Sequence, residues 1–219
     1  MIKLKDILFE GETPTILIPR RIDDRVERKI QLYVHNGSQG DLDLSNLKLT
    51  KLPDILKTVD VGGNFVCNNN ILTSLENSPK SVGGIFDCRG NKLISLEGVP
   101  EKIVKRFHCG FNKLTSLVGG PKIVGGDFDC TANDLTSLEG APISVGSNFF
   151  CAHNDLTSLK GVPKVINGDF NCNGNNLTTL EGVPKVVNGY FSCSLNKGVK
   201  FKESQIRSVC NIQGEVFVV

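Results

Sequence analysis

Seven cysteines in this chain recur at a constant interval of 21 residues, and this periodicity constrains the fold more than any other feature. A phenylalanine stands two residues before each of these cysteines, and an asparagine stands three residues after each one. A fixed period of this length indicates a solenoid, in which one short supersecondary unit is copied and stacked on its neighbours. The cysteines are Cys67, Cys88, Cys109, Cys130, Cys151, Cys172 and Cys193.

The copy around Cys130 shows the repeating unit clearly. Phe128 and Cys130 are two residues apart, so on a strand their side chains point to the same side. Leu135 and Leu138 follow and are expected to point into the same core. The Gly-Ala-Pro sequence at 140–142 disfavours a long α-helix, which predicts an extended or 3₁₀ segment opposite the strand. Strands of successive units should pair in parallel, with phenylalanine on phenylalanine and cysteine on cysteine.

The repeated pattern Phe-x-Cys-x-x-Asn-x-Leu-x-x-Leu resembles the leucine-rich repeat. The adjoining Leu-Thr-Ser-Leu-Glu-Gly-x-Pro segment is similar to the short repeats of bacterial and bacteriophage proteins, which have one residue fewer and a leucine where this chain has glycine. The resemblance implies a β-rich, α/β-type right-handed solenoid with one parallel sheet on the concave face. It also implies a helical N-terminal cap and a helix-plus-strand C-terminal cap.

The pattern divides the chain into three parts of one structural domain. Residues 1–40 are expected to form an N-terminal segment and a capping helix. Residues 41–196 are expected to form the solenoid, with one degenerate repeat followed by seven regular ones. Residues 197–219 are expected to form the C-terminal cap.

The N-terminal part carries a sequence suited to closing the core. Ile22, Val26 and Ile30 recur every four residues and predict an amphipathic helix over 21–33. A short strand is predicted before it, over 15–18, between two prolines.

The C-terminal part predicts a second helix, over 203–210, followed by a last strand over 215–219. Ile206, Val209 and Cys210 would lie on one face of that helix. These two elements are expected to cover the open end of the core and limit edge-to-edge pairing.

The composition points away from several classes of protein. A formal net charge of +2 gives no electrostatic reason to expect nucleic acid or an anionic membrane. We find no signal peptide and no membrane span, which predicts a reducing cytoplasmic location. The cysteines are therefore interpreted as buried free thiols, and their 21-residue interval provides no paired ligands for a metal. The asparagines are expected to satisfy backbone groups at turns, and a ligand-binding ladder is the alternative.

The residues that flank the phenylalanines and cysteines differ from copy to copy, so we expect them to form the binding surface. A basic group, an acidic group and several aromatic residues are expected to face solvent there, a combination typical of protein interaction sites. Scattered exposed apolar residues are the alternative interpretation. The candidate partner-binding residues are Arg89, Arg106, His108, Phe111, Asp127, Asp129, Phe150, His153, Asp169, Asn171 and Tyr190.

The sequence predicts no enzyme, no catalytic residue and no cofactor. His108 adjoins Cys109, but neighbours on a strand point to opposite faces and cannot form a nucleophile–base pair. Asp127 and Asp129 share a face, where a flat open sheet is not expected to desolvate them enough for acid–base catalysis. The Gly-Gly pairs are interpreted as turns of the repeat and not as a phosphate-binding loop.

Three functions follow from these observations, in decreasing order of support. The first is a non-enzymatic protein-interaction module that binds a partner protein through the concave face. The resemblance to bacterial and phage repeats implies, more narrowly, an effector that inhibits a host defence or regulatory protein. The second is a structural protein that self-associates, as a homo-oligomer, through a terminal cap. The third is a nucleic-acid or nucleotide binder, against which the near-neutral charge argues.

Overall fold

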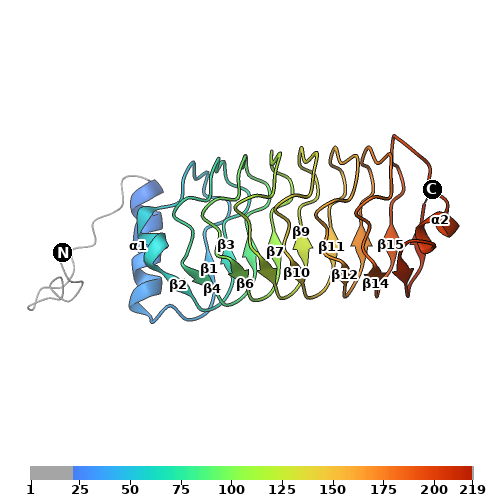
Figure 1. Ribbon diagram of the computed structural model, residues 1–219. Coiled ribbons are helices and arrows are strands. Elements are labelled where there is room, and N and C mark those ends of the chain that lie inside the picture. The colour runs from blue at the N-terminus through green and yellow to red at the C-terminus, as the bar shows by residue number, and fades with distance from the viewer. Residues whose placement is uncertain (1–21, 219) are drawn as a thin grey trace, which may run out of the picture.

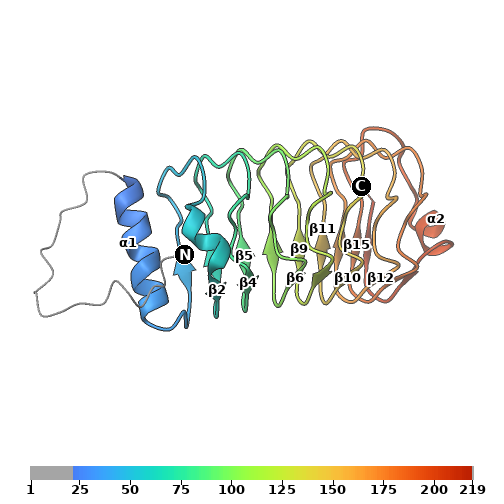
Figure 2. The same cartoon turned by 60° about the vertical axis from the view of Figure 1, so that its left-hand side comes forward.

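The computed structural model describes residues 22–218 and shows short coils stacked in chain order into an elongated body (Figures 1 and 2). Each coil contributes one strand to a nine-stranded sheet, in which all neighbours are parallel. The predicted parallel-sheet solenoid is therefore confirmed. The strands of this long sheet are β1 (Leu42–Asp43), β3 (Phe65–Val66), β5 (Phe86–Asp87), β7 (Phe107–His108), β9 (Phe128–Asp129), β11 (Phe149–Phe150), β13 (Phe170–Asn171), β15 (Phe191–Ser192) and β17 (Val216–Phe217).

The register of the long sheet stacks identical positions on one another. Phe107 pairs with Phe128, and Phe128 pairs with Phe149. Neighbouring rings of the phenylalanine column have centroids 5.1 to 6.0 Å apart. Each of the seven phenylalanines of the column is fully buried. Burial of large aromatic area together with tilted and edge-on ring contacts makes this column the main apolar support of the stack.

The repeated asparagine holds each coil to the one before it, as the sequence predicted. The Asn133 amide donates to the carbonyl oxygens of Cys109 at 3.1 Å and Cys130 at 3.0 Å. Its Oδ1 accepts from the amide of Leu114 at 3.0 Å. Asn133 is buried, and these bonds satisfy backbone groups for which no strand partner exists. The same contacts recur through Asn91, Asn112, Asn154 and Asn175.

A second series of strands, which the sequence analysis did not predict, lies near the end of each coil. These strands form two three-stranded sheets and one two-stranded sheet. Each is two residues long, with its second residue turned into the core. They are β2 (Asp60–Val61), β4 (Ser81–Val82), β6 (Lys102–Ile103), β8 (Ile123–Val124), β10 (Ser144–Val145), β12 (Val165–Ile166), β14 (Val186–Val187) and β16 (Asn211–Ile212).

The glycines after these strands are turn residues, as predicted, and neighbouring coils come very close together there. A Cβ atom on Gly125 would clash with the carbonyl oxygen of Val104 in the preceding coil. The turn leads directly into β9, so this close approach helps to fix the spacing of the long sheet.

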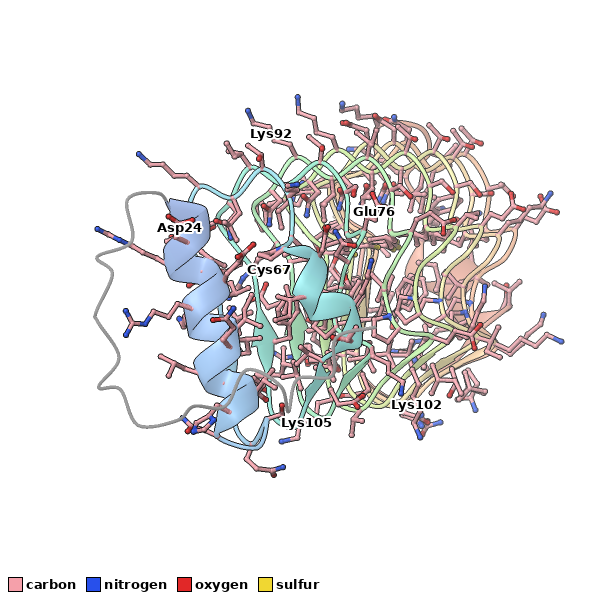
Figure 3. All side chains as sticks on the ribbon, turned by 90° about the vertical axis from the view of Figure 1, so that its left-hand side faces the viewer. Asp24, Cys67, Glu76, Lys92, Lys102 and Lys105 are labelled. Atoms are coloured by element: carbon pink, nitrogen blue, oxygen red, sulfur yellow. The ribbon has the colours of Figure 1, made fainter. Side chains whose placement is uncertain are left out.

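Helix α1 (Ile22–His35) lies across the N-terminal end of the stack, as Figure 3 shows in a view along it. Val26 and Ile30 are buried, which confirms the predicted capping helix. The Lys29 ammonium donates to the carbonyl oxygen of Asp43 at the outer edge of β1, the first strand of the sheet in the described part of the chain. The first coil also holds a short 3₁₀ helix, η2 (Asp54–Thr58). The strand predicted over 15–18 lies outside the described residues.

The C-terminal helix is shorter than predicted. Helix α2 covers Glu203–Arg207, with Ile206 and Cys210 buried. Val209 lies in the turn after the helix and is 42% exposed, so it does not share a helix face with Ile206. The strands that follow, β16 and β17, extend the two series of strands by one more coil.

Arg207 supplies hydrogen-bond donors to the last coil, where a further coil would otherwise supply backbone amides. Its guanidinium donates to the carbonyl oxygens of Ile212 and Gly214, each at 2.9 Å. In the preceding coil the corresponding oxygens, of Val187 and Gly189, accept from backbone amides of the next coil. Arg207 is held in place by a 2.7 Å ion pair with Glu203, one helical turn earlier.

Candidate interaction surface

We call the solvent side of the nine-stranded sheet the long-sheet face. Its side chains come from two positions of each coil, the residue before and the residue after the buried phenylalanine, because alternate residues of a strand point to opposite sides. Arg89, Phe111 and His153 instead follow the cysteine, at the edge of this face. The predicted binding residues on the face itself are Arg106, His108, Asp127, Asp129, Phe150, Asp169, Asn171 and Tyr190.

Four ionisable side chains on adjacent coils form one paired group at the centre of the face. Arg106 forms an ion pair with Asp127, and His108 Nδ1 lies 3.3 Å from Asp129 Oδ2. Arg106 Nη1 lies 3.4 Å from His108 Nε2. This geometry fits an imidazole that donates from Nδ1 to Asp129 and accepts at Nε2 from Arg106. Two of the predicted basic residues and two of the predicted acidic residues therefore form one connected cluster, which we call the charged quartet.

The two carboxylates of the charged quartet are less exposed than the sequence analysis expected. The side chain of Asp127 is only 7% exposed, beside an Arg106 side chain that is 46% exposed. Burial alone would raise the pKa of Asp129, but hydrogen bonds from His108 and from the amide of Thr131 outweigh it and hold that pKa below its usual value. Both groups are therefore fixed acceptors for their neighbours.

Arg89 belongs to a second ionic contact, within its own coil. Its Nε lies 3.1 Å from Asp87 Oδ2, and Asn68 donates to the same oxygen at 3.0 Å. Asp87 is buried, whereas half of the Arg89 side chain remains exposed. The sequence analysis did not select Asp87, although it occupies the same repeat position as His108 and Asp129.

The aromatic residues differ in exposure. Phe111 is 64% exposed, as expected, whereas Phe150 and Tyr190 are only partly exposed. Tyr190 packs edge-on against Phe217 with ring centroids 5.8 Å apart. Phe217 was not selected from the sequence, but its pairing with Ser192 places it at the position after the phenylalanine of the repeat.

Two further candidates have backbone partners within the scaffold. Asp169 Oδ1 accepts from the amide of Tyr190 at 3.0 Å, and Asn171 Oδ1 accepts from the amide of Asn173 at 3.0 Å. Asp127 Oδ1 likewise accepts from the amide of Asn148 at 3.2 Å. These residues thus stabilise the turns beside the sheet in addition to facing solvent.

The arrangement of coils allows a comparison with known structures. A leucine-rich-repeat domain of a Shigella effector superposes on this chain with a TM-score of 0.62. The two chains share 17% sequence identity, and the match covers 91% of this chain and 92% of that domain. This chain folds as a leucine-rich-repeat solenoid. Its sequence matches no protein-family profile and no curated protein.

The thiols of this leucine-rich-repeat solenoid lie inside it and have no disulfide partner. Burial raises the pKa of the Cys130 thiol well above its usual value, with a smaller contribution from neighbouring Cys151. Cys109 is fully buried, whereas the adjacent His108 belongs to the charged quartet on the long-sheet face, so the two side chains lie on opposite sides of the strand. Among residues 22–218, no group of three or more His, Cys, Asp or Glu side chains is arranged to hold a metal ion.

The N-terminal end of the solenoid contains a cleft of about 1140 Å³ between α1 and the second series of strands. Its lining includes Val34, Ile55, Val82 and Val104, and it lies apart from the charged quartet. None of the helices in the described part of the chain is both long and apolar enough to pass through a membrane.

Proposed function

We propose that this solenoid is a non-enzymatic protein-interaction module that binds a partner protein through the long-sheet face. One contrast carries the proposal. The buried phenylalanine, cysteine, leucine and asparagine positions repeat from coil to coil, whereas the side chains on the face do not. In repeat proteins the stacked scaffold presents an extended surface, and the residues that the scaffold leaves free determine what that surface binds.

The contacts on the face support a preorganised surface. Asp127 and Asp87 are buried and hold Arg106 and Arg89, whose outer parts remain exposed. A guanidinium has five donors, so one that is anchored on a carboxylate still has donors available for a partner. Side chains that are already ordered lose less conformational entropy on binding. Tyr190 and Phe217 add an aromatic pair at the C-terminal end of the face.

The narrower proposal is that the protein is a phage or bacterial effector that inhibits a host defence or regulatory protein in the cytoplasm. Its support is the resemblance of the repeats to bacterial and phage sequences. A fold alone does not determine function, so this narrower proposal depends on identifying the partner.

The experiment begins with capture of proteins from a cell lysate on the immobilised chain, followed by mass spectrometry and calorimetric titration of each purified candidate. Phe150→Ala should weaken binding at least about tenfold if the residue belongs to a binding hot spot. Lys164→Ala is the matched control, because Lys164 is exposed outside the long sheet and should leave the affinity unchanged. Equal affinity for wild type and Phe150→Ala would place binding elsewhere, and retention of no protein would contradict the proposal.

The second proposal, self-association through a terminal cap, predicts a mass that rises with concentration in light scattering. A monomer up to millimolar concentration would reject it. Nucleic-acid binding is the least supported, because the Arg106 guanidinium of the charged quartet is already paired with the Asp127 carboxylate. Fluorescence anisotropy with labelled RNA and DNA at low salt tests that alternative directly.

A further inference from the structure

One position of the repeat has a left-handed backbone in every regular coil. It lies two residues after each cysteine of the column, at the edge of the long-sheet face, and its φ ranges from 52° to 65°. Seven consecutive coils share this conformation, so it is imposed by the turn. The residues are Asn69, Gly90, Phe111, Ala132, His153, Gly174 and Leu195.

The left-handed conformation itself favours glycine or asparagine, which occupy three of these seven positions. Glycine has no Cβ to clash in the left-handed region, and asparagine tolerates the region better than other side chains. A phenylalanine there is unfavourable for the backbone, and Phe111 has a φ of 55°. Phe111 is also 64% exposed, so the core gains little from its ring. The left-handed backbone and the exposed ring both make phenylalanine unfavourable in the isolated fold. Backbone strain of this kind is concentrated at functional sites.

The surroundings of Phe111 indicate what chemistry would cover it. Lys113 follows it by two residues, and Lys92 belongs to the preceding coil. Both lysines are exposed, and neither forms an ion pair within residues 22–218. Figure 3 shows Lys92 pointing outward from the stack, on the side away from Lys102 and Lys105. An exposed apolar ring on a part of the surface that also carries exposed lysines is complementary to an apolar pocket with an acidic rim.

We infer that Phe111 is the anchor of the partner interface, and that the partner is a folded protein with an apolar pocket rimmed by carboxylates. The inference rests on the proposed function and adds the anchor and the chemistry of the partner. A membrane is a poorer match, because the two coils after Phe111 present exposed Asp134 and Asp155 at the position of the lysines. An anionic lipid surface along this edge would meet those carboxylates.

The test separates a binding role from a structural one by measuring stability and affinity on the same variants. Phe111→Asn introduces the residue found at Asn69, in the same conformation. It should raise the thermal midpoint by about 2–4 °C, because it removes the strain and the exposed ring. The same variant should weaken the affinity for the partner at least about tenfold. Ala132→Gly, one coil further on, is the control, because it relieves the same backbone conformation and should bind as the wild type does.

The partner is the protein that wild type and Ala132→Gly retain from a cell lysate and that is then purified and titrated by calorimetry. Lys92→Glu should weaken the affinity measured in this titration about fivefold and make that affinity less dependent on salt concentration. A lower thermal midpoint in Phe111→Asn would make Phe111 structural and would overturn the inference. Unchanged affinity in Phe111→Asn, with loss in Phe150→Ala, would overturn the inference while leaving the proposed function intact.

Three further results would also contradict the inference. Retention of no protein by any variant would reject the proposed function and the inference together. Phe111-dependent sedimentation with vesicles of phosphatidylcholine and phosphatidylserine would show that the ring contacts lipid. Phe111-dependent self-association in light scattering would show that the occupant is a second copy of the chain.

Discussion

The buried cysteine column predicts that this protein loses stability steeply in mild alkali. Burial raises the pKa of six thiols far above the usual range, those of Cys67, Cys88, Cys109, Cys130, Cys151 and Cys172. The folded protein therefore keeps these protons, whereas the unfolded chain releases them above a pKa of about 8.5. The contribution of these thiols to the free energy of unfolding should be constant below that pH and should fall as the pH rises above it.

The expected loss is large compared with the stability of a typical domain. One pH unit above the thiol pKa of the unfolded chain, each protected thiol removes about 1.4 kcal/mol from the free energy of unfolding. Six such thiols together remove about 8 kcal/mol, and whole domains are stable by only about 5–15 kcal/mol. The reduced protein should therefore be close to unfolding at about pH 9.5.

Urea unfolding followed by circular dichroism, between about pH 6.5 and 9.5 with a phosphine reductant present, measures this loss. Cys130→Ala is the matched control, because it removes one titrating group and leaves the lysines and tyrosines that also titrate in alkali. Between about pH 7.5 and 9.5 the wild type should lose about 1.4 kcal/mol more than Cys130→Ala. An identical pH dependence in the two proteins would refute the argument, because it would mean that the Cys130 thiol ionises as readily in the folded state as in the unfolded chain.

Three further changes test the packing of the coils, each by urea unfolding. Phe128→Ala should lower the free energy of unfolding by about 3–5 kcal/mol because it opens a gap in the ring column, whereas Lys164→Ala should change it by less than about 0.5 kcal/mol. Similar effects of the two substitutions would contradict the assignment of Phe128 to the core. Asn133→Ala should cost about 2–4 kcal/mol, since it removes three buried hydrogen bonds, whereas the more exposed Asn176→Ala should cost less than about 1 kcal/mol. Arg207→Ala should cost about 1–3 kcal/mol and speed amide exchange in the last coil; unchanged exchange there would argue against its capping role.

The main features of the stack could be predicted from the sequence because one interval recurs. The spacing from Phe128 to Phe149 places like residues on adjacent strands. An asparagine buried at the same turn of each coil is expected to hydrogen-bond to the backbone groups of that turn. Helix α1 was equally accessible, since its apolar stripe needs only local periodicity. The second series of strands was missed because most of them have a single buried residue, such as Val124, with no buried residue two positions before or after it, whereas Phe128 and Cys130 show the alternation of a strand.

Parts of the candidate surface were missed although their signal was present. Arg106 and Asp127 are 21 residues apart, as are His108 and Asp129, so the repeat itself brings each pair together. These pairs are recognised only when equivalent positions of adjacent coils are compared. The left-handed position of Phe111 was also open to prediction, because Gly90 and Gly174 occupy it in other coils. The partial burial of Tyr190 was not, since it depends on packing of the neighbouring aromatic ring.

Each 21-residue unit of the solenoid is one interchangeable coil, and the stacking of like residues follows from this property. Deleting residues 131–151 joins Cys130 to Ala152 and preserves the spacing from cysteine to asparagine. This variant should fold, and its maximum dimension in small-angle X-ray scattering should be shorter by about 4.8 Å, the spacing of one strand. Deleting residues 131–150 instead leaves one extra residue between Phe128 and Asn154 in the joined coil, so the cysteine and the asparagine cannot both keep their buried positions there. This variant should be much less stable than the 21-residue deletion. If both deletions unfold the protein, or if both are equally stable, the coils are not the units described here.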